Sequence, residues 1–114
     1  MMRRFFFAGL NNVFAIERRE RTSDGRGGFV LSYQAVDFAR GRIRPASGRE
    51  REVAASEERE ISHILYVLAG TDIERGDRVT SGDLTVDVMA IREPSLAGLH
   101  LEIDCMERQQ EVTA

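Results

Sequence analysis

The sequence has no lysine: all 16 basic residues of the 114-residue chain are Arg. A high-GC genome favours Arg codons, so this absence alone indicates no function. The single cysteine, Cys105, cannot form an internal disulfide, which excludes the secreted disulfide scaffolds. No apolar run approaches the roughly 18–20 residues that span a bilayer, so we expect no membrane partner. With two prolines and 42% hydrophobic residues, the composition excludes collagen-like, low-complexity and strongly disordered chains.

The length fits one domain, which we take as residues 1–114. An N-terminal arm, 1–11, begins like a signal peptide, but its apolar run is only six residues long and Asn11 and Asn12 follow it. We therefore expect synthesis in the cytoplasm. Exposed Phe residues in this arm are expected to dock on a partner or on the chain's own barrel.

Charge is divided unevenly along the chain. Residues 1–51 hold 11 Arg against 5 acids, a net of +6, and residues 52–114 hold 5 Arg against 14 acids, a net of −9. The small formal net charge of −3 is therefore the sum of a strongly positive first half and a strongly negative second half. Such asymmetry favours contacts with other subunits, or a local polyanion contact, over catalysis.

Alternating apolar and polar residues with tight turns dominate the sequence and predict a mainly β fold. The Asp-Gly and Gly-Gly pairs of residues 22–28 predict a hairpin turn, and Gly41 suggests a β-bulge. We expect a small antiparallel β-barrel or sandwich of six to seven strands. The predicted strands cover residues 12–21, 29–34, 35–44, 59–68, 77–80, 84–91 and 99–108, with the most apolar run, 64–68, covered on both faces.

An inserted long loop or short helix is predicted between strands, at residues 45–58. Ser47, Gly48 and Glu50 lie in a capping-box pattern, in which Ser47 accepts from an early helical amide and Glu50 reaches back. The residues that follow, including Val53, favour a helix of eight to ten residues with little to bury, or a segment that orders only in an assembly. Residues 109–114 are predicted to form a flexible tail.

No catalytic, cofactor or metal site emerges from the residues. His63, His100 and Cys105 stand apart without metal-ligand spacing, and Cys105 is expected to be a small buried hydrophobe. Glu102 and Asp104 are expected to point outward opposite Leu101 and Ile103. No phosphate-binding loop or nucleophile elbow occurs, so we predict a protein that is not an enzyme and needs no cofactor.

A row of arginines is the main candidate for function. On a strand, Arg40, Arg42 and Arg44 would project to one face roughly 6.6–7 Å apart, and Arg49 and Arg51 follow. Guanidinium groups bind carboxylates and phosphates in the same bidentate way. The row therefore suits a subunit interface, a DNA channel, or a solvated strand face that discourages aggregation.

The order of these features resembles the phage head–tail joining proteins, also called head–tail adaptor, head-closure or stopper proteins. The resemblance covers about residues 12–108 and begins with the hairpin and its Asp-Gly turn. It continues through Arg44-Pro45-Ala46-Ser47-Gly48-Arg49-Glu50, which is similar to the family's proline and Ser-Gly-x-Glu segment, then Glu60-Ile61-Ser62-His63 and Gly76-Asp77-Arg78-Val79.

The resemblance implies a small β-barrel that assembles as a homo-oligomeric ring in a virion neck. Its partners would be the portal-side connector or adaptor ring and the tail-terminator proteins, with non-specific contact to packaged DNA. Our own hypothesis is that the inserted segment, with the candidate residues Ser47, Gly48, Glu50 and Val53 and the cations Arg49 and Arg51, lines or closes the channel. The alternative is a free β-barrel module that binds nucleic acid through the Arg40–Arg51 region, with a steep inverse salt dependence.

Overall fold

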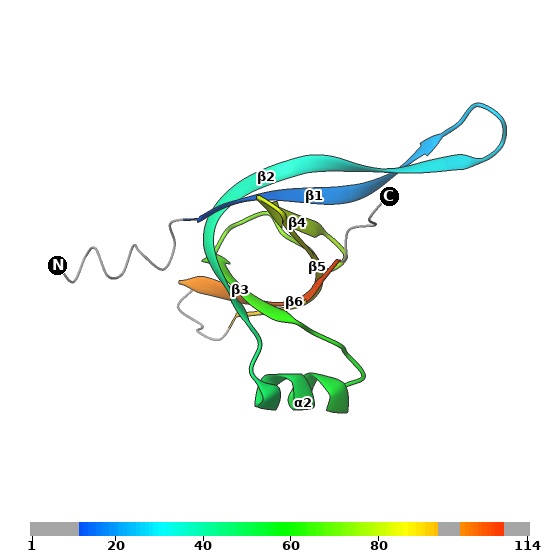
Figure 1. The fold of residues 1–114 in the computed structure, drawn as a ribbon. Helices are drawn as coiled ribbons and strands as arrows, with labels where there is room; N and C mark the ends of the chain where they lie inside the picture. Colours follow the sequence, from blue (N-terminus) through cyan, green and yellow to red (C-terminus); the bar gives the residue numbers. More distant parts are fainter. Residues whose placement is uncertain (1–11, 94–98, 109–114) are drawn as a thin grey trace.

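The computed structural model describes residues 12–93 and 99–108, which form a closed antiparallel barrel of six strands with one inserted helix (Figure 1). Around the barrel the strand order is β1-β2-β3-β6-β5-β4, and β1 pairs with β4 to close it. The predicted fold class is confirmed, whereas the predicted arm 1–11 and tail 109–114 lie outside the described residues. The elements are β1 (Asn12–Ser23), β2 (Phe29–Pro45), α2 (Gly48–Ser56), β3 (His63–Leu68), β4 (Arg78–Ser81), β5 (Leu84–Arg92) and β6 (His100–Glu107).

The barrel interior is filled by one face of each strand. Because successive strand residues point to opposite faces, the apolar residues of the alternating runs meet inside the barrel. The innermost side chains are less than 3% exposed and come from five of the six strands: Phe14, Ile16, Leu65, Val67, Val79, Val86, Val88, Ile103 and Cys105. β2 adds Ala39, which is 8% exposed.

β2 is one strand of 17 residues, so the predicted division into strands 29–34 and 35–44 is wrong. A β-bulge carries the chain through this point: Ile16 pairs with Asp37 and Glu17 with Ala35, which leaves Val36 as an extra residue. The bulge predicted at Gly41 is therefore misplaced.

Gly41 instead lies on the inner face of β2, where the neighbouring atoms leave no room for a side chain. A Cβ at this position would lie 2.5 Å from the Tyr66 carbonyl oxygen and 3.0 Å from Val67 Cγ1. The glycine thus permits the close approach of β2 to β3 across the bend seen in Figure 1.

Beyond the barrel, β1 and β2 continue as a two-stranded hairpin, hereafter the hairpin arm (residues 17–35; Figure 1). The predicted turn is confirmed: Gly25 and Gly27 have φ of 77° and 84°, which other residues rarely adopt. Asp24 Oδ1 accepts hydrogen bonds from the backbone N–H groups of Arg26 and Gly28 at 2.7 and 3.0 Å. The side chain of Asp24 therefore fixes the tip of the arm.

The inserted segment is a helix, and its predicted capping box is confirmed. Ser47 Oγ accepts from Glu50 N, while a Glu50 carboxylate oxygen accepts from Ser47 N at 2.8 Å. Ala54 is 2% exposed and packs on Ala46, Ile61 and Ile64 in a second small core. This core covers Ile64 and part of Tyr66 on the outer side of β3, whereas Leu68 is 50% exposed. The prediction that the run 64–68 is covered on both faces is therefore confirmed only in part.

The strand predicted to start at Arg59 starts at His63. The first of the residues between them complete the turn that ends α2. Glu58 takes a positive φ of 61°, and Arg59 N donates back to Ala54 O at 2.8 Å. The chain then joins the barrel edge where Ser62 N donates to Cys105 O.

The crowding at Gly41 predicts a strong stability effect. Gly41→Ala should lower the free energy of unfolding by about 2 kcal/mol, since the new methyl group meets backbone that cannot withdraw. The measurement is urea unfolding with an unchanged slope. Gly48→Ala is the control: nothing lies within 4 Å of its Cβ position, and alanine favours a helix. Equal stability of the two variants would contradict the packing described here.

Candidate functional site

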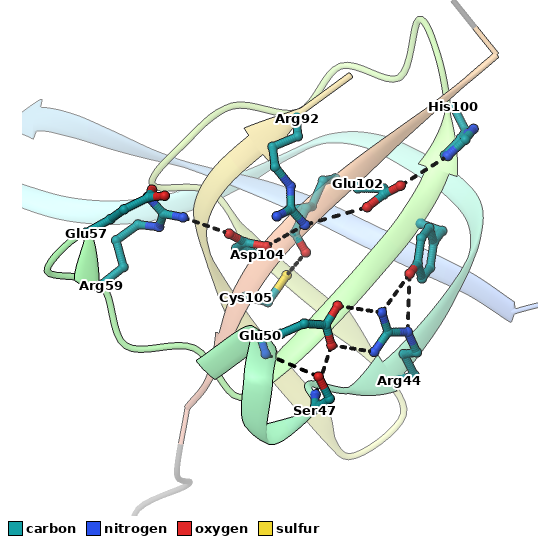
Figure 2. Close-up of polar contacts among 12 residues, drawn as sticks. Arg44, Ser47, Glu50, Glu57, Arg59, Arg92, His100, Glu102, Asp104 and Cys105 are labelled. Carbon is teal, nitrogen blue, oxygen red and sulfur yellow. Dashed lines mark hydrogen bonds and ion pairs between the residues drawn. The ribbon is translucent and has the colours of Figure 1, made fainter. Parts of the chain in front are cut away.

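Arg44 makes its contacts within its own subunit and connects three secondary-structure elements. Its guanidinium donates to the two carboxylate oxygens of Glu50 at 2.8 and 2.7 Å and to the Tyr66 hydroxyl at 2.9 and 3.2 Å (Figure 2). The same contact with Arg44, helped by the Ser47 amide, lowers the pKa of Glu50 to about 2. Arg44 thus fastens α2 to β2 and β3 rather than facing a partner.

Arg40 and Arg42 lie on the outer face of β2 and are exposed. They alternate with the buried residues Ala39 and Gly41, and Phe38, on the same face, is 67% exposed. Within the described part of the chain, neither arginine makes an ion pair. These two cations are available to a partner.

Arg49 and Arg51 point to different sides of α2, because two residues along a helix correspond to about 200° of rotation. Arg49, with Val53, borders a cleft of about 250 Å³ between α2 and the barrel, and Arg51 is exposed. The five candidate arginines are therefore not brought into one row: two face outward on β2, two flank the helix, and Arg44 is engaged between them.

Asp104 does not point into solvent as predicted. It is 1% exposed, and Arg59 Nη2 and Arg92 Nη2 lie 3.1 and 2.8 Å from its two carboxylate oxygens (Figure 2). Glu102 keeps a 28% exposed side chain beside Arg92. Glu102 and Asp104 thus lie on the outer face of β6, as the alternation predicted. Asp104 is nevertheless shielded from solvent, because two arginines and the helix insertion cover it.

This covered carboxylate forms the floor of the α2 cleft. Ala54 and Ile61 supply an apolar wall, while Arg59 and Arg92 stand over Asp104. Arg59 also pairs with Glu57, just after α2. Through Arg59 and Arg92, Asp104 links the helix insertion to β5 and β6, and Arg44 links it to β2 and β3.

Cys105 and His63 have the packing roles expected from sequence. Cys105 is fully buried, and burial raises the pKa of its thiol to about 12. His63 Nδ1 lies 2.8 Å from Ser62 Oγ. In the described ranges, no group of three or more His, Cys, Asp or Glu side chains is placed to hold a metal ion. No helix in those ranges is long and apolar enough to cross a membrane.

Among the described residues, most arginines of the first half make no ion pair. Arg18 pairs with acids near residues 72–77 and Arg44 pairs with Glu50. Among the described residues, the first-half arginines outside any ion pair are Arg19, Arg21, Arg26, Arg40, Arg42, Arg49 and Arg51, and the second-half acids outside any ion pair are Glu52, Glu58, Glu60, Asp83 and Glu93.

The closed barrel, the inserted helix and the projecting hairpin define a small β-barrel protein. A family model described as phage head completion protein matches residues 7–108. The chain belongs to this family, and its role is a structural one at the head–tail junction of a virion, in which it is located.

Two solved structures share the fold. Protein SF1141 from Shigella flexneri 2a superposes with a TM-score of 0.73 at 18% identity, covering 90% of this chain and 96% of that one. A chain from the virion of a native gene transfer agent particle has a TM-score of 0.61 at 25% identity, covering 87% and 96%. No curated protein sequence matches the chain significantly.

The Arg44–Glu50 contact predicts a pH dependence. Glu50 has a pKa of about 2 when folded and 4.5 ordinarily, so its stabilisation is complete above pH 4.5 and lost as pH falls toward 2. Glu50→Gln should unfold more easily than wild type at pH 7, by about 1 kcal/mol, and this difference should vanish near pH 2. Glu52→Gln, at an exposed position of α2, should change stability little. A difference for Glu50→Gln that is constant from pH 7 to 2 would contradict the assignment.

Asp104 predicts a larger effect at neutral pH. Asp104→Asn leaves two partly covered arginines without their common anion and should cost about 3 kcal/mol in the free energy of unfolding. Glu102→Gln removes a more exposed partner of Arg92 and should cost less than about 1 kcal/mol. Chemical denaturation of both variants checks this order, and the reverse order would contradict the role given to Asp104.

Proposed function

We propose that the chain is a head-completion (stopper) protein that forms a ring between the head connector and the tail and helps retain packaged DNA. The observation that carries this proposal is the family match over residues 7–108, supported by the likeness to a chain of a gene transfer agent virion. The ring would contact the portal-side connector on one side and the tail-terminator proteins on the other.

Surface charge supports assembly from identical copies. Subunits around a ring meet through two different surfaces, so a positive surface on one copy has to fit a negative surface on the next. Seven first-half arginines and five second-half acids have no ionic partner within the described part of the subunit. Contacts between copies would neutralise both sets.

Retention of DNA would depend on arginines that are not engaged in contacts between the subunits of the ring. Arg40 and Arg42 are exposed on β2, and Arg49 and Arg51 flank α2 at the end of the same bend. Such groups contact phosphates without reading sequence, as a channel through which the whole genome passes requires. The role is structural, with the helix insertion as the element that lines or closes the channel.

A free nucleic-acid-binding barrel is the second candidate, favoured by the exposed pair Arg40 and Arg42. It predicts that the purified chain binds duplex DNA as a monomer, with affinity that falls steeply as salt rises. The neck role predicts instead that DNA contact depends on assembly with the other virion proteins.

Deletion of the gene tests the neck role. Particles produced without it should appear in negative stain as heads separated from tails, either full or emptied, and wild-type protein supplied in trans should restore tailed particles. Normal tailed particles from the deleted genome would overturn the proposal.

A shorter deletion tests the helix insertion. Replacing residues 48–57 with a glycine-serine linker of equal length should give particles that lose DNA, because the segment that closes the channel is gone. Arg49→Glu with Arg51→Glu, which keeps the helix, should reduce DNA retention as well, whereas Glu52→Gln should not. Full retention by both altered proteins, with normal tail joining, would contradict a channel role for α2.

A further inference from the structure

The hairpin arm is attached to the barrel at its base, where Arg18 pairs with Asp77 and the Arg78 guanidinium stacks over the Tyr33 ring, and its outer part extends away from the barrel (Figure 1). Past residue 17, β1 has no neighbour in the described structure except β2, and β2 meets β3 only from Gly41 onward. An isolated two-stranded hairpin is marginally stable in water. The arm ends in three consecutive apolar residues, Phe29, Val30 and Leu31, which are 61, 54 and 57% exposed. A covering surface would stabilise it.

The two faces of the arm differ. The pairs Arg21–Leu31 and Ser23–Phe29 place Phe29 and Leu31 on the same face as Arg21 and Arg19, and Val30 lies on the other. The Arg21 guanidinium stacks over the Phe29 ring, 4.4 Å from its centre. Arg19, Arg21, Phe29 and Leu31 line one shallow open hollow, hereafter the arm face. It combines apolar surface with two cations outside any ion pair in the described chain.

A surface of matching character lies on another side of the same molecule. An open groove, hereafter the β5 groove, runs between the end of α2 and β5. Its floor is Met89, Ala90 and Ile91, where a bulge interrupts the pairing of β5 with β6. Its lining residues are Glu57, Glu58, Arg59, Arg75, Met89, Ala90 and Ile91.

The charges of the groove fit those of the arm. Arg59 is already engaged by Glu57 and Asp104, and Glu58 is exposed and outside any ion pair in the described ranges. Arg75 also borders the groove, and the arm carries Glu17 at the base of the same face. Both surfaces thus combine apolar side chains with charged ones, and in the described ranges the arm face has cations outside any ion pair where the groove has the anion Glu58.

We propose that the arm face of one copy of this chain docks in the β5 groove of the next copy. Leu31 and Phe29 would cover Met89 and Ile91, and Arg21 or Arg19 would pair with Glu58. The two surfaces are different, so the contact is heterologous and repeats around a ring. This inference rests on the proposed ring, for which it names the contact between neighbours.

A charge exchange tests the contact directly. Arg21→Glu reverses a charge on the arm face and leaves the β5 groove unchanged. Glu58→Arg reverses a charge in the β5 groove and leaves the arm face unchanged. Each variant supplied alone to the gene-deleted genome should yield about tenfold fewer tailed particles than wild type. Supplied together they should restore assembly, because each arm then finds a groove of opposite charge on the alternate copy.

The outcomes separate the contact from the neck role. If wild-type protein fails to restore tails, the neck role is wrong and the contact falls with it. If wild type restores them and the single variants do so equally well, the contact is wrong while the neck role stands. If both variants fail alone and also together, the arm binds a different protein, which again overturns the contact between copies.

Position 30 provides a matched control within the arm. Leu31→Ser and Val30→Ser remove apolar side chains of nearly equal exposure from opposite faces. We expect Leu31→Ser to reduce tailed particles about tenfold and Val30→Ser to leave them unchanged. Far-ultraviolet circular dichroism of the purified variants checks that both fold. Equal loss for the two would overturn the assignment of the arm face.

A cross-link measures the contact without relying on charge. In particles that carry Leu31→Cys and Met89→Cys in one chain, oxidation should give a ladder of multimers on a non-reducing gel, because the buried Cys105 does not compete. Val30→Cys with Met89→Cys should give little ladder. A ladder of equal strength from the Val30 pair, or none from the Leu31 pair, would overturn the docking proposed here.

Discussion

Closure of the barrel at β1 and β4 is the constraint on which the rest of the molecule depends. Only three residue pairs form this seam, between residues 15–17 and 78–80. Arg18, the next residue of β1, completes it: its guanidinium donates to both carboxylate oxygens of Asp77, at 3.1 and 3.0 Å, and to Asp72 at 2.9 Å. Asp77 is 2% exposed and also accepts from Glu74 N, and these acids raise the pKa of Arg18. The short β1–β4 pairing is thus reinforced, because the guanidinium of Arg18 and the buried carboxylate of Asp77 form charge-assisted hydrogen bonds. The hairpin arm starts at this seam, with Glu17 and Arg18 at its base.

β2 then links three of the features with a candidate role. One uninterrupted strand carries the arm face at its start, the outward pair Arg40 and Arg42 in its middle, and the Arg44 attachment of α2 at its end. The bulge at Val36 and the close approach at Gly41 allow this strand to leave the arm and then bend around the barrel. The arm and the helix insertion are therefore connected by a single strand. This strand is hydrogen-bonded to β1 along the arm and to β3 near the helix.

Local signals were sufficient for much of this structure, and long-range pairing was not. The Asp24 turn, the Ser47 capping box and the alternating strands were predictable because each depends on residues within a few positions of one another. The continuity of β2 was not, because the bulge is defined by what lies opposite it on β1. The burial of Asp104 was also missed, since its partners Arg59 and Arg92 are 45 and 12 positions away and nothing in either local pattern indicates a shared carboxylate. Among the candidate arginines, the sequence placed Arg40 and Arg42 correctly on an outer face, but it could not show that Glu50 and Tyr66 engage Arg44.

The uneven charge of the chain takes on a physical meaning once the internal pairs are known. In the described residues, Arg59, Arg92 and Arg108 pair with four acids of their own half, and Arg18 is the one arginine that forms ion pairs between the halves, with three acids. The arm and β2 therefore keep their positive charge, and the end of α2 keeps exposed acids such as Glu58. A fold that needed only its own stability could have paired these groups within the subunit. Their separation onto different surfaces leaves them available to other chains, as a protein built for a virion junction requires.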